Sequence, residues 1–400
     1  YLSGTSWIIN SLTFDENFKI LIPFGLILIP LFLSLFTALT ILFVGPYLRF
    51  DFPSLIIFSG SLALSDYLRA KVLTGFPWNL WAYSTVWVNE ILQILNIIGL
   101  YSYNLLLITV FTSPIIIFFN ISTIRKFIYF SLISFGIFSL FIFGNYEINK
   151  NKKKLNEINE KIYVKVISPN FDLKYGLTED QIEQRFKKLI RYSDPASDRK
   201  TLFIWPEGVF SGYSYGEVLI FRKLILKNFS KNHLIIFGVN KLDAQSGNFY
   251  NSMLLVDNNF EIIQSYDKRK LVPFGEFLPF EIFLNKFGLK KITHGHGSFS
   301  KGDKQKNLIL EKANILPLIC YEIIFPELIQ SQGYRNNLII NISEDAWFGG
   351  SIGPYQHFAK AIFRSVENNT YLARSANQGI SAFISNNGQV IKKLEPNETG

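Results

Sequence analysis

Residues 20–44 form an unbroken run without a single charged side chain. As a helix, a run of this length is long enough to cross a hydrocarbon core roughly 30 Å thick. Two further uncharged runs cover residues 96–119 and 127–143, and the short loop between them carries Arg125 and Lys126. We therefore predict membrane-spanning helices at all three runs, with the last two forming a hairpin.

A fourth apolar run, residues 54–65, is short and continues into Asp66 and Arg69. These two residues are three positions apart, so they can form an ion pair on one helix face. The pair is either a water-exposed helix end, which is the more common situation, or a functional polar site at membrane depth. Residues 75–83 follow as an aromatic loop with a Gly and a Pro, which is typical of an interfacial belt or of a lid over a lipid.

Charge is concentrated after this region. Of the 40 Lys and Arg residues, 7 lie in residues 1–150 and 33 in residues 151–400. We predict a transmembrane region over residues 1–144, a polar linker over 145–160 and an α/β domain over 161–400. With four spans, both ends of the first region face the same side of the membrane. The positively charged loops lie on the opposite side, which the positive-inside rule makes cytoplasmic, so the ends of the region lie outside the cytoplasm.

The formal net charge of +9 does not indicate a nucleic-acid partner. Nucleic-acid binding needs basic residues interleaved with stacking aromatic residues on one face, and the sequence has no such array. Basic clusters near a membrane instead favour anionic lipid headgroups. A single cysteine excludes an internal disulfide, and His294 and His296 lack the spaced partners of a metal site, so we expect a loop there and no metal.

Apolar strands and amphipathic helices alternate after residue 161, which predicts a sheet covered by helices. Thr178 to Gln181 has the pattern of a capping box that opens a helix. No phosphate-binding or dinucleotide-binding glycine motif follows a strand, so no cofactor is expected. Strands are predicted near residues 163–168, 201–205, 233–240, 250–257, 261–264, 318–320 and 337–343, and helices near 178–190, 217–231 and 353–368.

Three polar side chains follow apolar strands, where they are costly unless they face a cleft. Glu207 comes after one strand, Lys268 after another, and Cys320, the only cysteine, ends a third. A thiol is mostly protonated at neutral pH, so Glu207 is a candidate base for it, and Lys268 is a candidate to stabilise an oxyanion. The pattern places no histidine as the base.

Taken singly, each of these residues also has an ordinary structural interpretation. A lone cysteine in an apolar strand is usually a small core residue, a Glu after a strand is usually a helix cap, and a Lys in a basic cluster is usually solvated. Their occurrence together, beside Pro and Gly turns, favours the catalytic interpretation.

The motifs around these residues resemble the nitrilase superfamily and, within it, the apolipoprotein N-acyltransferase family. The resemblance rests on residues 205–207 (Trp-Pro-Glu), 271–276 (Leu-Val-Pro-Phe-Gly-Glu), 319–322 (Ile-Cys-Tyr-Glu), 345–349 (Asp-Ala-Trp-Phe-Gly) and 353–357 (Gly-Pro-Tyr-Gln-His), joined to an apolar membrane region. It implies a four-layer αββα sandwich for the α/β domain. One position departs from the pattern: the family usually has Asn where this chain has Glu344.

The resemblance also implies residue roles. Glu207 would be the general base, Lys268 the oxyanion stabiliser and Cys320 the nucleophile, with Glu276 and Glu322 supporting the geometry. Side chains expected to line the acyl or headgroup pocket, or to make a polar contact there, are Trp205, Asn251, Tyr321 and Trp347.

The implied reaction is a two-step acyl transfer without a cofactor. Cys320 would take the sn-1 acyl chain of a phospholipid, usually phosphatidylethanolamine, and the α-amine of a diacylglyceryl-cysteine on an apolipoprotein would then accept it. The resemblance implies a monomer in the bacterial inner membrane with its catalytic domain in the periplasm. The only Met is Met253, so we expect a piece of a longer protein. The resemblance implies that three spans before residue 1 and one after residue 400 are missing.

Two alternatives stay open from the sequence. A membrane-anchored amidase or nitrilase would use the same three residues on a small soluble substrate. A polytopic transporter or scaffold with an inert α/β domain would not need Glu207 or Lys268.

Overall fold

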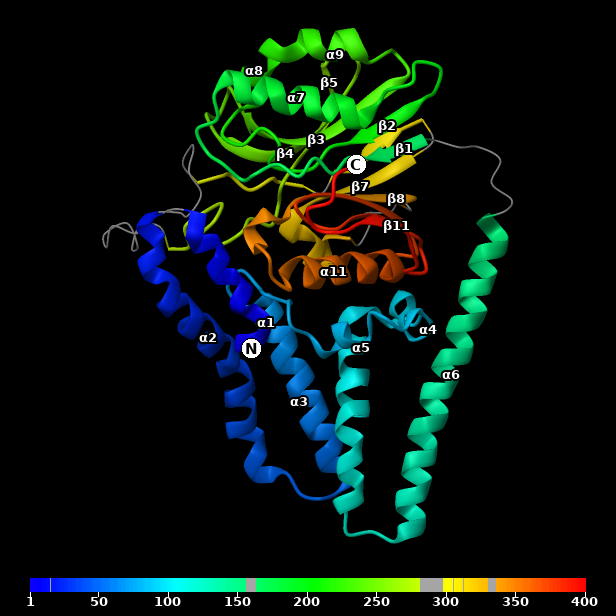
Figure 1. The fold of residues 1–400 in the computed structure, drawn as a ribbon. Helices are drawn as coiled ribbons and strands as arrows, with labels where there is room; N and C mark the ends of the chain where they lie inside the picture. Colours follow the sequence, from blue (N-terminus) through cyan, green and yellow to red (C-terminus); the bar gives the residue numbers. More distant parts are fainter. Residues whose placement is uncertain (15, 156–162, 281–297, 305, 312, 330–335) are drawn as a thin grey trace.

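The computed structural model describes residues 1–14, 16–155, 163–280, 298–304, 306–311, 313–329 and 336–400. Its N-terminal region is helical, and its C-terminal region contains two sheets with helices on their outer faces (Figure 1). The helical region comprises α1 (Leu2–Thr5), η1 (Ser6–Phe14), η2 (Glu16–Leu21), α2 (Ile22–Val44), η3 (Gly45–Tyr47), α3 (Phe52–Lys71), η4 (Trp81–Thr85), α4 (Asn89–Leu92), α5 (Leu95–Thr112), η5 (Ser113–Phe118) and α6 (Thr123–Leu155).

Within the described part of the chain, three helical segments are long and apolar enough to cross a membrane. They are Phe18–Tyr47, Leu95–Phe118 and Thr123–Asn151. The helix α3 is not among them, because its C-terminal half carries charged residues, so the expected fourth span is not supported on length and composition. The α2–α3 and α5–α6 connections lie together at the end away from the sheets (Figure 1).

The ion pair predicted in α3 is not at a water-exposed helix end. Asp66 and Arg69 are 3% and 2% exposed, and Arg69 Nη2 lies 2.9 Å from Asp66 Oδ1. Arg69 also donates to the carbonyl oxygens of Phe76 and Asn79, at 2.8 and 3.1 Å, and Asn104 donates to Asp66 at 2.9 Å. The pair therefore holds the aromatic loop after α3, and the exposed interpretation is wrong because the loop folds back over it.

The stretch expected to be a linker is largely helical. The helix α6 continues without a break through Leu155, and residues 156–162 lie outside the described residues. The low apolar content of residues 145–155 does not prevent helix formation, since Lys, Glu and Asn side chains on a helix can face solvent. The division of the chain into domains at these positions remains a prediction.

Two sheets make up the C-terminal region. The first has the order β1-β2-β3-β4-β5 and the second β11-β10-β9-β8-β7-β6. In the first sheet β1, β2 and β3 are parallel; in the second, β7, β8 and β9 are parallel. The strands are β1 (Tyr163–Val166), β2 (Thr201–Ile204), β3 (His233–Leu242), β4 (Phe249–Val256), β5 (Ile262–Asp267), β6 (Leu308–Leu310), β7 (Ala313–Ile319), β8 (Leu338–Glu344), β9 (Tyr371–Asn377), β10 (Ser381–Ile384) and β11 (Val390–Leu394).

Helices on the outer faces complete a four-layer αββα sandwich. Between the sheets lies an apolar core that includes Ile204, Met253 and Ile340. The helix α7 (Glu179–Ser193) opens with the predicted Thr178 to Gln181 capping box and packs on the first sheet through Phe186 and its neighbours. The helix expected over residues 217–231 is instead α8 (Tyr215–Val218), η6 (Leu219–Phe221) and α9 (Arg222–Asn228).

The second sheet is covered by α11 (Gly353–Glu367), which also contacts the membrane region (Figure 1). Trp78, in the loop after α3, donates to Gln356 Oε1 at 2.6 Å, and Trp7 donates to the same oxygen at 3.0 Å. The Trp78 ring stacks on His357 with ring centroids 5.6 Å apart. These contacts of Trp7 and Trp78 with α11 hold the α/β domain against the apolar helices.

Candidate active site

The three residues singled out at strand ends line one cavity. Glu207 follows β2, Lys268 follows β5, and Cys320 follows β7 and opens η8 (Cys320–Ile324). All three line a cavity of about 1100 Å³. Parallel strands of a sheet end at one edge, and the two sheets face each other, so residues far apart in the sequence meet there.

Lys268 is held between two carboxylates. Its Nζ lies 2.9 Å from Glu276 Oε1 and 3.4 Å from Glu207 Oε1, and its side chain is 1% exposed. Burial alone would lower the pKa of Lys268, but the Glu207 and Glu276 carboxylates outweigh it and raise the pKa above its usual value. The lysine is therefore a fixed ammonium group.

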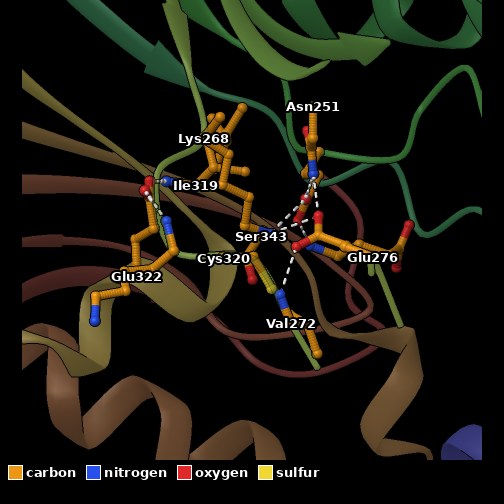
Figure 2. A network of polar contacts seen from close by, with 12 residues as sticks. Asn251, Lys268, Val272, Glu276, Ile319, Cys320, Glu322 and Ser343 are labelled. Atoms are coloured by element: carbon orange, nitrogen blue, oxygen red, sulfur yellow. Dashed lines mark hydrogen bonds and ion pairs between the residues drawn. The ribbon is translucent and has the colours of Figure 1, made fainter. Parts of the chain in front are cut away.

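Asn251, on β4, connects the same two carboxylates. Its Nδ2 donates to Glu207 Oε1 at 2.7 Å and to Glu276 Oε1 at 2.6 Å. Figure 2 shows Asn251, Lys268 and Glu276 pointing toward one another, with Cys320 beside them. The second oxygen of Glu276 accepts from the backbone N–H of Val272 at 2.8 Å, which locks that carboxylate in place. The expected polar contact of Asn251 is thus with the site's acids.

Glu207 itself is oriented from the opposite sheet. Its Oε2 accepts from the backbone N–H of Glu344 at 3.0 Å. Gly208, the next residue, has φ +74, and a Cβ there would lie 2.5 Å from Glu344 Oε2. Only glycine fits this approach, because the conformation disfavours other residues and the space is already filled.

Cys320 has an unusual backbone conformation for a residue with a side chain, with φ +49. It sits between β7 and η8, and Glu322 holds this turn from inside. Glu322, which is fully buried, accepts from the backbone N–H groups of Ile319, Arg269 and Lys270 at 2.9, 2.7 and 3.1 Å. Non-glycine residues in this region of φ cost energy and occur often at functional sites.

The electrostatics keep the resting thiol protonated. Burial, and then the Glu207 carboxylate, raise the pKa of the Cys320 thiol, while the Lys268 ammonium partly offsets them.

The pKa of Glu344 differs from that of an ordinary surface acid. Its burial, together with the nearby Glu207 and Asp345 carboxylates, raises the pKa of Glu344 well above its usual range.

A buried polar network beneath Cys320 was missed by sequence reasoning. Nε2 of His357, on α11, lies 3.3 Å from the carbonyl oxygen of Cys320, and Nδ1 lies 3.0 Å from Asp345 Oδ1. Arg374 Nη2 lies 2.7 Å from Asp345 Oδ2 and 3.0 Å from His357 Nδ1. Burial, and then Arg374, lower the pKa of His357, which favours the neutral imidazole.

Most of the expected pocket residues lie at the cavity. Tyr321, Trp347 and Asn251 line it, as does Glu276, which was expected to support the geometry. Trp205 does not: it is fully buried on the outer face of the first sheet, where its Nε1 donates to Ser193 Oγ of α7 at 2.9 Å. The expectation for Trp205 is wrong because successive side chains of a strand point to opposite faces, and Trp205 takes the face covered by α7.

The wall opposite the polar groups is apolar and comes from the membrane region. Phe24, Leu28 and Phe32 of α2 line the cavity, although each is about half exposed on the helix surface. The helix α2 lies within the candidate span Phe18–Tyr47. The cavity therefore runs from the Cys320 thiol to the surface of a membrane-spanning segment.

Two family models match the chain. Residues 1–113 match the apolipoprotein N-acyltransferase N-terminal domain, and residues 176–400 match the carbon-nitrogen hydrolase model. Apolipoprotein N-acyltransferase from Rhodopseudomonas palustris is 30% identical over 98% of this chain and 76% of its own length. The chain belongs to the apolipoprotein N-acyltransferase family. It is an acyltransferase of the carbon-nitrogen hydrolase superfamily and a membrane protein.

Other members of the apolipoprotein N-acyltransferase family show a similar sequence identity and coverage. The enzyme from Brucella melitensis is 30% identical over the whole chain and 76% of its own length, and that from Rickettsia prowazekii is 30% identical over the whole chain and 79% of its own length. Among solved structures, a mutant Nesterenkonia AN1 amidase of the nitrilase superfamily matches with a TM-score of 0.40 and 19% identity, covering 60% of this chain and 86% of that one.

The position at which this chain departs from the family pattern has a defined environment. Glu344 Oε1 accepts from the backbone N–H of Ala346 at 3.1 Å, and Asn377 Nδ2 lies 3.0 and 2.9 Å from its two oxygens. Among the described residues, no cluster of three His, Cys, Asp or Glu side chains is arranged to hold a metal. His294 and His296 lie outside the described residues.

Proposed function

We propose that this protein transfers the sn-1 acyl chain of a phospholipid, through a thioester on Cys320, to the α-amine of a diacylglyceryl-cysteine on an apolipoprotein. The observation that carries the proposal is the single cavity that joins a thiol, an ammonium and a carboxylate to the apolar face of α2. A lipid can present its ester to the thiol while its chain stays against the spanning helix.

In the first half-reaction Glu207 takes the thiol proton as the sulfur of Cys320 attacks the ester carbonyl carbon. The Lys268 ammonium stabilises the negative charge that forms on the carbonyl oxygen. The intermediate collapses with cleavage of the carbon–oxygen bond to the glycerol. Glu207 returns the proton to that oxygen, and a lysophospholipid leaves.

In the second half-reaction the acceptor amine is the nucleophile and the thiol is the leaving group. The amine nitrogen of the acceptor attacks the thioester carbonyl as Glu207 accepts a proton from it. Lys268 again stabilises the oxyanion, the carbon–sulfur bond breaks, and the proton passes from Glu207 to the sulfur. The products are an N-acylated lipoprotein and free Cys320, which is a ping-pong sequence.

Within this proposal, Glu276 and Asn251 are positioning residues. They keep Lys268 charged and hold Glu207 Oε1 in place, while Glu322 shapes the turn that presents the thiol. Because both substrates are anchored by lipid chains, a site at the membrane surface meets them without extracting those chains into water.

We place the catalytic domain on the periplasmic side of the bacterial inner membrane, and we expect a monomer. Arg49 lies in the α2–α3 connection, and Arg125 and Lys126 lie in the first turn of α6, so all three are at the end away from the sheets (Figure 1). The positive-inside rule makes that end cytoplasmic. Phosphatidylethanolamine is the proposed donor.

The test uses the full-length protein in membranes that contain phosphatidylethanolamine with a radiolabelled sn-1 chain. We expect label on the protein that hydroxylamine releases, and an equal amount of lysophospholipid. Cys320→Ala should carry no label. Label that persists in Cys320→Ala would overturn the thioester, and ammonia release from small amides without lysophospholipid would favour the amidase alternative.

A further inference from the structure

A second cavity of about 440 Å³ lies on the other side of Trp78 from the candidate active site. It is formed between the loop after α3, including η4, and the exposed side of α11. Trp78 lines both cavities and separates them. The proposed acyl transfer makes no use of this second cavity.

Lys360 of α11 lines the second cavity and is 2% exposed. Its Nζ lies 4.4 Å from the ring centroid of Trp78 and 4.4 Å from that of Tyr83. Across the described ranges, the Nζ of Lys360 makes no hydrogen bond and no ion pair. Glu367, a carboxylate on the same helix, does not pair with Lys360. It pairs instead with Arg364 at 2.7 Å and accepts from the backbone N–H of Leu100 at 2.9 Å.

This environment is incomplete for an ammonium group. Two aromatic faces attract a cation but do not replace the hydrogen bonds that it had in water. Burial, and then the neighbouring Arg364 guanidinium, lower the pKa of Lys360 well below its usual range. An anion in the cavity would supply both the charge and the hydrogen-bond acceptors that Lys360 lacks.

Gln356 adds a donor at the same cavity. Its Oε1 already accepts from the indole N–H groups of Trp7 and Trp78. Because these two donors fix the orientation of the amide, only its N–H groups remain for an incoming group. The cavity thus offers an amine, which a bound anion would keep protonated, and an amide N–H, and both of these recognise an oxyanion.

The rim of the cavity lies at the membrane region. Trp81 and Tyr355 are 49% and 55% exposed and line the cavity. The Trp81 ring contacts Phe111 of α5, with ring centroids 6.1 Å apart, and Phe111 belongs to the candidate span Leu95–Phe118. Phe111 lies in the C-terminal half of this span and is itself 45% exposed, so the Trp81 side of the rim borders the lipid-facing surface of the span.

We propose that this second cavity is a binding site for the phosphodiester group of a net-anionic phospholipid headgroup, held by Lys360 and Gln356. The site is separate from the acyl-transfer cavity and does not contain Cys320, so a lipid bound there is not consumed by the proposed thioester reaction. Free inorganic phosphate has the same recognising chemistry, and the test below distinguishes the two sources.

The experiment uses the full-length protein in detergent with Cys320→Ala, so that no lipid is turned over. Dimyristoyl phosphatidylglycerol, dimyristoyl phosphatidylcholine and inorganic phosphate are titrated separately. The apparent Tm and the number of lipids retained in native mass spectrometry are recorded. We expect phosphatidylglycerol to raise the Tm and to stay bound to one site more strongly than phosphatidylcholine.

Two further variants locate that site. Lys360→Met should lose the phosphatidylglycerol response, while Lys392→Met, which removes an exposed lysine of β11, should keep it. If Lys360→Met does not fold, Ala359→Trp provides the same test, because it fills the cavity and leaves Lys360 in place.

The outcomes separate the possibilities. An equal response to inorganic phosphate would assign the site to a soluble anion and overturn the lipid. An undiminished phosphatidylglycerol response in both Lys360→Met and Ala359→Trp would mean that the lipid binds elsewhere, and no response to any anion in the parent protein would refute the site. None of these results depends on whether Cys320 forms a thioester.

Discussion

The Lys268 ammonium nitrogen lies 2.9 Å from Glu276 Oε1, and the two side chains are only 1% and 9% exposed. The same nitrogen also donates to Glu207 Oε1 at 3.4 Å, so the ammonium is paired with both carboxylates and lies closer to Glu276. The two carboxylates keep the ammonium charged, and the shorter contact with Glu276 fixes its position.

Glu276→Gln should slow the formation of the acyl-enzyme by about 100-fold. Without the Glu276 carboxylate, the existing contact between Lys268 and Glu207 tightens, so Glu207 becomes a weaker base and the ammonium is displaced from the oxyanion. Rapid-quench measurement of labelled acyl-enzyme should show a lower kcat and an unchanged KM for the phospholipid. Glu311→Gln, at an exposed turn, is the matched control, and an unchanged kcat in Glu276→Gln would contradict the positioning role.

Glu207→Gln should lower the pKa of the Cys320 thiol and yet abolish its acylation. Since the Glu207 carboxylate raises the pKa of the Cys320 thiol, its removal lowers that pKa. A lower pKa by one unit makes alkylation by iodoacetamide at a fixed alkaline pH about tenfold faster. Acylation by phospholipid should nevertheless be lost, because the base is gone. Slower alkylation in the variant would show that the carboxylate stabilises the thiolate instead.

Glu344→Gln should change how stability depends on pH. The folded-state pKa of Glu344 is raised above its unfolded value, so the folded protein holds this proton more tightly. Stability from this group is fully present below the unfolded pKa and is lost as the pH rises toward the folded pKa. The variant should therefore show a smaller fall in apparent Tm between acidic and mildly alkaline pH.

Scanning calorimetry of the wild type and Glu344→Gln at several pH values tests this prediction. Glu311→Gln provides an exposed control that should follow the wild type. Parallel pH profiles for all three proteins would mean that Glu344 is ionised in the folded state, with Asn377 and Ala346 as sufficient donors.

Gly208→Ala should impair acyl transfer more than its backbone strain explains. Gly208 and Gly212 both have positive φ, at +74 and +85, so an alanine at either position costs roughly 1 to 2 kcal/mol. A Cβ at Gly208 would meet Glu344 Oε2 at 2.5 Å, whereas one at Gly212 has no atom within 4 Å. We expect similar losses in Tm, but a large loss of acyl-enzyme formation only in Gly208→Ala.

Equal activity in Gly208→Ala and Gly212→Ala would show that Glu344 can move without disturbing Glu207. The comparison is informative because both substitutions add a methyl group to a residue with positive φ. Of the two, only a Cβ at Gly208 would meet the opposite sheet.

The sequence alone predicted the apolar helices α2, α5 and α6 and strands at or near β1 to β5, β7 and β8, but no strand at β6 or β9. Uncharged runs and short apolar runs are local patterns, and the sequence shows them directly. The same local logic identified Glu207, Lys268 and Cys320, because each follows an apolar strand. The structure brings these three residues to one cavity, while their catalytic roles remain predictions.

Local patterns failed where burial depends on distant parts of the chain. The pattern of Asp66 and Arg69 left an exposed helix end and a polar site at membrane depth open, and the aromatic loop and Asn104 exclude the first. The family resemblance placed Trp205 at the pocket, but α7 covers its face of the sheet. Neither neighbour could be assigned from sequence spacing.

The sequence determined which side chains stand at strand ends and which helices can enter a membrane, because both follow from residue type and local period. The tertiary structure decided what those side chains contact. The Asp345, His357 and Arg374 network below Cys320, and the uncompensated Lys360 beside Trp78, join a loop, a helix and a strand that are distant in the chain. Hydrogen bonding and desolvation act through space, so only the folded chain defines them.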